Sequence, residues 1–168
     1  IEIVTRVRPG LPPAVAVIVG TESKTDDADA LIAEAVVHAK SAEIAIVVVG
    51  TNASVESEGF DRKSLVLPGR QDDLVRAVAA ANSNTIVIVN SGSPVLVPWR
   101  NEVSTILLTY FAGQEMGNAI VDMLTGRAEP GGRLPTTWAS TEADVPVLDT
   151  EPKNGVVHYD EGIHIGYR

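Results

Sequence analysis

The chain has 168 residues, of which 45% are hydrophobic and 21% charged, a mix typical of a globular domain and not of a disordered chain. A net charge of −9 argues against nucleic acid and anionic membranes as partners. The sequence contains no apolar run of about 18 residues, the length that a membrane-spanning helix needs. Cysteine is absent, which excludes disulfides, thiolate catalysis and cysteine-ligated metals. The chain opens without a Met or the features of a signal peptide, so we expect a piece of a longer polypeptide, and the sequence predicts no compartment.

Residues 1–22 predict a β segment. Residues 1–7 alternate weakly, residues 8–13 form a cluster rich in Pro and Gly, and residues 14–19 are an apolar strand.

Helices and strands alternate from residue 26 onward. Asp26 and Asp27 are candidate caps for a helix whose apolar face runs from Leu31 to Ala39. The further elements that we expect are strands at 44–50, 85–90 and 104–111, helices at 71–82 and 113–124, and a late edge strand at 133–138.

The β-branched run at 44–50 is typical of a strand buried on both faces of a parallel sheet. The alternation predicts an α/β fold, with a mainly parallel sheet and helices on both faces, as in a flavodoxin-like α/β sandwich.

Ligands of open α/β sheets bind beyond the carboxyl ends of the strands. Three segments are expected there: residues 50–59, 90–94 and 111–115. Trp99 lies in a loop a little further on, where it could stack on a ligand or pack in the core or between domains.

Several common chemistries lack their motifs. The glycine fingerprints of nucleotide sites are absent, and so is the G-x-S-x-G elbow of serine hydrolases. His38, His158 and His164 are scattered, so the sequence predicts neither a metal site nor a cofactor.

The carboxylates Glu56, Glu58 and Asp61 remain, on the first and longest of the three loops. They form either a solvated acidic loop or the site of a general acid. In the second interpretation, partial burial raises the pKa of one carboxyl, and Arg62 neutralises Asp61 and fixes the loop. Such an acid protonates a leaving oxygen, as in glycoside hydrolysis.

Residues 55–71, VESEGFDRKSLVLPGRQ, strongly resemble the E-x-E-G-[FY]-D-R-x-x-L-x-L-P-x-x-Q stretch of glycoside hydrolase family 3. The likeness to the C-terminal α/β-sandwich domain of its β-glucosidases covers about residues 26–168. It continues through the segments NSGSPV at 90–95, FAGQEMG at 111–117, DMLTG at 122–126, PGGRLP at 130–135 and YDEGIHIGYR at 159–168.

This resemblance implies a retaining β-glucosidase acting on terminal non-reducing β-D-glucosyl residues of a glucoside or oligosaccharide. A separate (β/α)8 barrel domain would carry the Asp nucleophile. The α/β domain, residues 23–168, would supply the acid/base, with the two carboxyls about 5–5.5 Å apart. Glu58, directly before the glycine, matches the acid/base position best, and Glu56 is the alternative.

Two departures from the family pattern leave alternatives open. The chain holds no barrel and hence no nucleophile, so we expect it to be inactive alone. A non-catalytic domain that binds carbohydrate or a partner is the alternative function. Residues 1–22 resemble the end of an inserted β-rich module, or they contain the first strand of the domain itself.

We also expect the three carboxylates to repel one another. Without the barrel, the loop at 52–65 should then open into solvent with Glu58 exposed.

Overall fold

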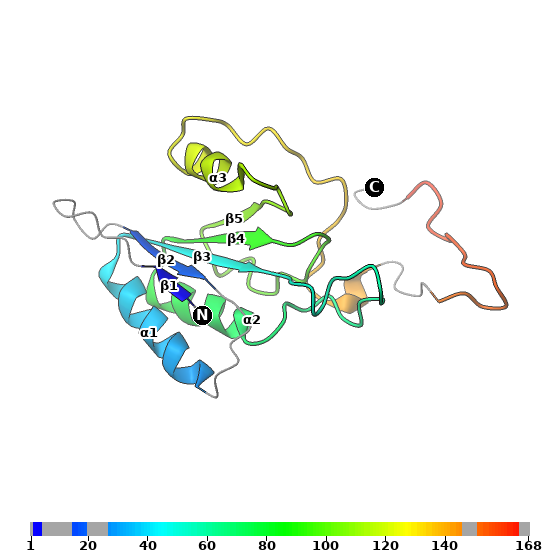
Figure 1. The fold of residues 1–168 in the computed structure, drawn as a ribbon, viewed down its shortest axis with the longest axis horizontal. Coiled ribbons are helices and arrows are strands. Elements are labelled where there is room, and N and C mark those ends of the chain that lie inside the picture. Colours follow the sequence, from blue (N-terminus) through cyan, green and yellow to red (C-terminus); the bar gives the residue numbers. More distant parts are fainter. Residues whose placement is uncertain (1, 5–14, 20–26, 146–150, 165–168) are drawn as a thin grey trace.

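The protein folds around a five-stranded β-sheet (Figure 1). The computed structural model describes residues 2–4, 15–19, 27–145 and 151–164. The strands are β1 (Glu2–Val4), β2 (Val15–Val19), β3 (Ile44–Gly50), β4 (Thr85–Asn90) and β5 (Thr105–Leu108). They keep this order across the sheet, with β1 antiparallel to β2 and the remaining neighbours parallel. The prediction of a mainly parallel α/β sheet is therefore confirmed.

Helices lie on both sides of this sheet. They are α1 (Ala28–Ser41), α2 (Gln71–Ala81) and α3 (Met116–Leu124), followed by the 3-10 turn η1 (Glu142–Asp144). The helices α1 and α2 cover one face, and α3 stands on the other side near β5 (Figure 1). Because β–α–β crossovers are right-handed, strands that are added in one direction place their helices on the same face.

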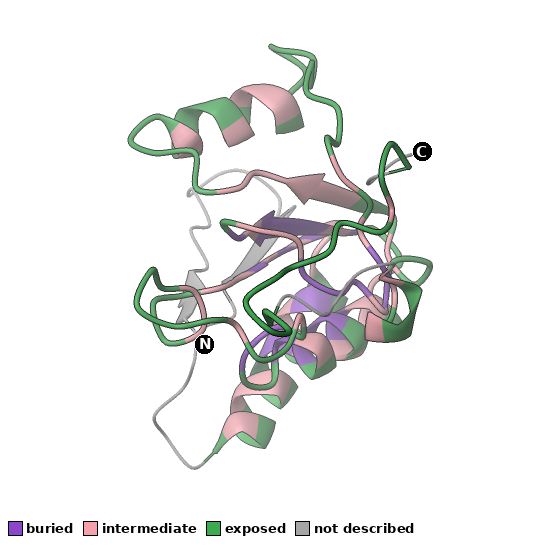
Figure 2. Ribbon diagram, turned by 90° about the vertical axis from the view of Figure 1, so that its right-hand side faces the viewer, coloured by how far each residue is buried: buried purple, intermediate pink, exposed green. Residues whose placement is uncertain are grey.

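The core lies between the sheet and the α1–α2 layer, where the buried residues gather in Figure 2. The strand β3 alternates, with Ala45, Val47 and Val49 buried and the residues between them half-exposed. The prediction that this strand is buried on both faces is therefore wrong. The physical reason is that α3 gives little cover, since none of its residues, all of which the structure describes, is buried.

The predicted boundaries fail where the backbone takes a left-handed turn. The strand β5 stops at Leu108, and Tyr110 has a φ of +51° that no strand residue adopts. The helix α3 begins at Met116 and not at 113, because Gly113 has a φ of +76°. Gly126, with a φ of +72°, lies just beyond the end of this helix, where a left-handed glycine is common.

Residues 133–138, all of them described, form no strand, which corrects the sequence prediction. The Arg133 guanidinium donates to the carbonyl oxygens of Pro130, Gly131 and Gly132 at 3.3, 3.3 and 2.9 Å. These short-range bonds curl the chain around the side chain, and Pro135 has no N–H to give to a ladder.

Trp99 packs in the core, so the core-packing interpretation is confirmed. Its side chain is fully buried, and its indole N–H donates to Asp72 Oδ1 at 2.7 Å. Trp99 belongs to the connection between β4 and β5, which contains no helix. The indole therefore joins this connection to the first turn of α2.

Part of the segment at 1–22 lies outside the described residues. In the rest, β2 pairs in parallel with β3, with Val15 opposite Ile44 and Val19 opposite Val48. The assignment of this segment to an inserted module or to the domain itself stays a prediction. No helix in the described ranges has the length and apolar character needed to cross a membrane.

Candidate active site at the carboxyl edge of the sheet

The loop that follows β3 starts from a tightly built strand end. The side chain of Gln71 accepts from the Gly50 N–H at 2.8 Å and donates to the Gly50 carbonyl at 2.9 Å. A Cβ on Gly50 would lie 2.0 Å from the carbonyl oxygen of Asn90, so only glycine fits where the paired ends of β3 and β4 approach each other. The backbone N–H groups of Val55 and Glu56 then donate to the Asn52 carbonyl at 3.0 and 2.9 Å, which turns the chain.

This turn directs the Glu56 carboxylate inward, onto the loop that follows β4. Glu56 Oε2 accepts from the Gly92 N–H at 3.0 Å and from the Thr51 hydroxyl. Glu56 Oε1 accepts from the Ser93 hydroxyl and lies 3.7 Å from Arg62 Nη1. Only 15% of the Glu56 side chain is exposed. Glu56 is therefore a largely buried anion with donors on both oxygens.

Arg62 reaches the same loop from the other end of the turn. Its Nη1 donates to Ser93 Oγ at 2.7 Å and to the Pro94 carbonyl at 3.1 Å, while Nε donates to the Ser64 carbonyl at 3.1 Å. In the described part of the chain, the ion-pair partner of Arg62 is Glu56 and not the neighbouring Asp61. The guanidinium thus neutralises a different carboxylate from the one that its sequence position suggests.

The pKa of Glu56 reflects these contacts. Burial alone raises it, but the hydrogen bonds from Ser93, Thr51 and Gly92, together with the charge of Arg62, outweigh burial and lower the pKa below its ordinary value. A carboxyl that stays ionised cannot hold a proton ready for a leaving oxygen. This environment is unsuited to a general acid.

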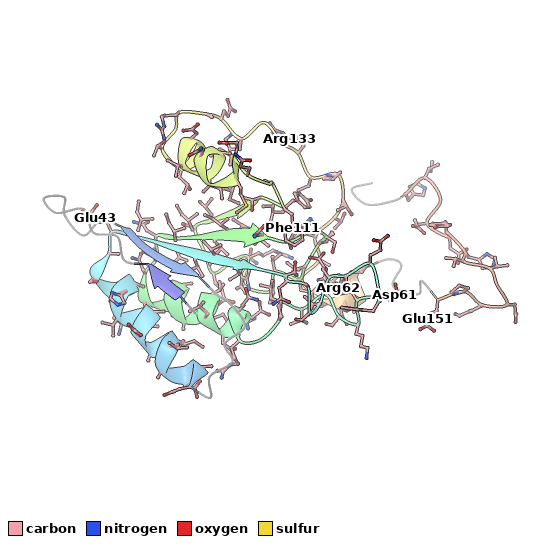
Figure 3. All side chains as sticks on the ribbon, in the orientation of Figure 1. Glu43, Asp61, Arg62, Phe111, Arg133 and Glu151 are labelled. Carbon is pink, nitrogen blue, oxygen red and sulfur yellow. The ribbon has the colours of Figure 1, made fainter. Side chains whose placement is uncertain are left out.

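Glu58 lies on the exposed turn between Glu56 and Arg62. Ser57 pairs with Phe60 in a short antiparallel bridge, and the Gly59 N–H donates to Ser57 Oγ at 3.1 Å. Glu58 is exposed, as we expected from the sequence. Asp61 is exposed as well and, with Arg62, lies on the loop beyond the carboxyl ends of the strands (Figure 3). Instead of opening into solvent, the loop turns its first carboxylate inward.

Several residues that hold this loop were not identified from the sequence. Ser93 and Gly92 belong to a segment predicted for this edge, but no pattern assigns them to Glu56. Glu142 accepts from the Ser64 hydroxyl at 2.8 Å and from the Leu65 N–H at 2.9 Å, and these bonds lower the pKa of Glu142. No signal in the sequence marks that contact, because 77 positions separate Leu65 from Glu142. Among the described residues, no three His, Asp or Glu side chains gather as metal ligands would.

Comparison with known proteins shows the family of this chain. Residues 4–167 match the Glycosyl hydrolase family 3 C-terminal domain, and the chain belongs to this family. The prediction from the motifs at 55–71 and beyond is thereby confirmed.

The chain is similar to β-glucosidases in both sequence and structure. It is 41% identical over 145 residues to a β-glucosidase of Rhizobium radiobacter. That alignment covers 83% of this chain and 18% of the relative. The crystal structure of the Kluyveromyces marxianus β-glucosidase in complex with glucose superposes with a TM-score of 0.79 at 38% identity, over 86% of this chain and 18% of that one. For the Bifidobacterium adolescentis GH3 β-glucosidase the TM-score is 0.77 at 37% identity, over 88% and 22%. The chain thus spans about a fifth of the length of these relatives.

Proposed function

We propose that this chain is the acid/base-bearing domain of a retaining β-glucosidase, with Glu58 as the general acid/base. The supporting observation is the difference in environment between two neighbouring glutamates. Glu56 is held as an anion by Ser93, Gly92, Thr51 and Arg62, while Glu58 is exposed on the turn next to it. Of the two glutamates, only Glu58 is free to approach a substrate that is bound by another domain.

The proposed reaction has two steps. In the first, an Asp on a (β/α)8 barrel domain attacks the anomeric carbon of a terminal β-D-glucosyl residue, and Glu58 gives its proton to the departing glycosidic oxygen. In the second, Glu58 takes a proton from a water molecule, whose oxygen replaces the Asp and releases glucose. The barrel rim would exclude water from Glu58 during the first step. Arg62 orients the loop, with Asp61 beside it.

Glu58→Ala in the complete enzyme tests this function. We expect kcat/KM to fall by about 100-fold or more for a disaccharide with a poor leaving group. A dinitrophenyl glucoside should lose much less in its glycosylation step, because its leaving group departs without a proton.

Glu43→Ala is the matched control. Glu43 is also an exposed glutamate, but it lies at the opposite end of the strands from Asp61 and Arg62 (Figure 3). We expect both of its kcat/KM values to equal those of the wild type. Equal small effects of Glu58→Ala on the two substrates would instead support a non-catalytic domain that binds carbohydrate or a partner.

A further inference from the structure

We propose that Glu56 is a positioning residue, whose carboxylate fastens the turn that carries Glu58 to the loop following β4. This inference rests on the proposed role of Glu58. It assigns to the first glutamate of the motif a task other than proton transfer.

The first argument is the placement of the fastening points. Glu56 precedes the turn at 57–61 and Arg62 follows it, and both side chains bind Ser93. The turn is therefore held at its two ends by the same loop. An extended chain spans at most about 3.6 Å per residue, so Glu58 Cα stays within about 7 Å of Glu56 Cα. A Glu56 side chain that lost its bonds to Gly92 and Ser93 would therefore release one end of the turn that carries Glu58.

The second argument is the chemistry of the fastening. The Gly92 N–H and the Arg62 guanidinium can only donate, so each requires an acceptor. A carboxylate offers an acceptor to both, Oε2 to Gly92 and Oε1 towards Arg62. A glutamine would offer one oxygen and would turn its NH2 group towards the other donor. The charge of Glu56 is thus required by its neighbours, and charge-assisted bonds are about twice as strong as neutral ones.

The third argument is that the fastening lies outside the core. The buried apolar cluster is built from the central strands, the helices α1 and α2, and the loop residues Leu67, Val95, Val97 and Trp99; Glu56 and Arg62 are not part of it. Glu56 and Arg62 stand at the edge of the sheet, with 15% and 14% of their side chains exposed. Gly92 brings the β4 loop close, since a Cβ there would lie 3.2 Å from Glu56 Oε1 and 2.9 Å from the Phe111 ring. Weakening these contacts should therefore shift the turn and leave the fold intact.

Glu56→Gln in the complete enzyme is the principal test. We expect kcat/KM for the disaccharide to fall by about 10- to 100-fold, because a displacement of about 1 Å is enough for such a loss. The glycosylation step of the dinitrophenyl glucoside should change by less than about 3-fold, since it needs no proton from Glu58. Ser93→Ala, which removes one hydroxyl, should show the same pattern with a smaller loss.

Glu102→Gln provides the matched control. Glu102 pairs with Arg76 at 3.5 Å and is exposed, so this variant also breaks an ion pair by changing a carboxylate to an amide. We expect its two kcat/KM values to match those of the wild type.

The double variant Glu56→Gln/Glu58→Ala separates positioning from an independent effect. If Glu56 acts through Glu58, adding Glu56→Gln to Glu58→Ala costs nothing further on the disaccharide. Losses that multiply in the double variant would overturn the proposal, and so would equal losses on both substrates in Glu56→Gln and Ser93→Ala.

The outcome for Glu58→Ala alone tells the two proposals apart. If Glu58→Ala spares the disaccharide and Glu56→Gln abolishes its hydrolysis, Glu56 is itself the acid and the proposed function is wrong. If Glu58→Ala has the expected effect and Glu56→Gln has none, only the positioning role fails.

Discussion

Removing the indole N–H of Trp99 should measure how strongly the β4–β5 connection is joined to α2. Trp99→Phe keeps an aromatic ring in a fully buried site but deletes the donor that lies 2.7 Å from Asp72 Oδ1. A hydrogen bond to a charged group contributes about 1.5–3 kcal/mol, and the smaller ring leaves a cavity that costs about 1 kcal/mol more. We therefore expect the free energy of unfolding to fall by about 2–4 kcal/mol.

Urea denaturation followed by far-UV circular dichroism gives this value without relying on tryptophan fluorescence. The contribution of the hydrogen bond itself comes from a cycle with Asp72→Ala, in which we expect a coupling energy of at least about 1 kcal/mol. A loss below about 0.5 kcal/mol for Trp99→Phe, or additive effects in the cycle, would refute this reasoning.

We make three further predictions. The isolated chain should not hydrolyse an aryl β-glucoside, because the Asp nucleophile is expected on another domain; turnover at ordinary glycosidase rates, after contaminants are removed, would contradict this. Gly50→Ala should destabilise the chain by about 2–3 kcal/mol in urea denaturation, since its Cβ would lie 2.0 Å from the Asn90 carbonyl oxygen and strain of this kind is costly; an unchanged midpoint would show that β3 and β4 yield there. Burial raises the pKa of Asp72 in the folded state, despite the Trp99 hydrogen bond and the charge of Arg76. The free energy of unfolding therefore falls as pH rises from the unfolded-state pKa of about 3.9 to the higher folded-state pKa. Asp72→Asn, which cannot ionise, should therefore gain stability relative to the wild type as pH rises through this window, and a constant difference in urea midpoints between pH 3 and 7 would contradict the shift.

The central elements were predictable because local pattern and tertiary environment agree in them. The strand at 44–50 is a β-branched run that ends at a glycine, and the structure places β3 at the same residues. The helix at 71–82 has its apolar residues at helical spacing, and α2 differs from it by one residue. In these segments, the residues that favour the element are also those that the core needs.

The site was less predictable because long-range contacts define it. Glu56 and Glu58 are the same residue type two positions apart, and nothing local says which of them turns inward. The contacts that decide, from Gly92 and Ser93, come from 36 and 37 positions along the chain. The false strand at 133–138 has a similar cause, since the side chain of Arg133 bonds three preceding carbonyls in a manner that β propensity does not register.

Azide rescue of Glu58→Ala tests the central claim most directly. In a retaining enzyme without its acid/base, dinitrophenyl β-glucoside still forms the glycosyl-enzyme, which then awaits a nucleophile that needs no deprotonation. The complete Glu58→Ala enzyme should accumulate this intermediate, and azide should accelerate turnover and give β-glucosyl azide, while Glu43→Ala should give glucose alone. Failure of azide to rescue Glu58→Ala, together with β-glucosyl azide from Glu56→Ala, would contradict the account and assign the acid/base to Glu56.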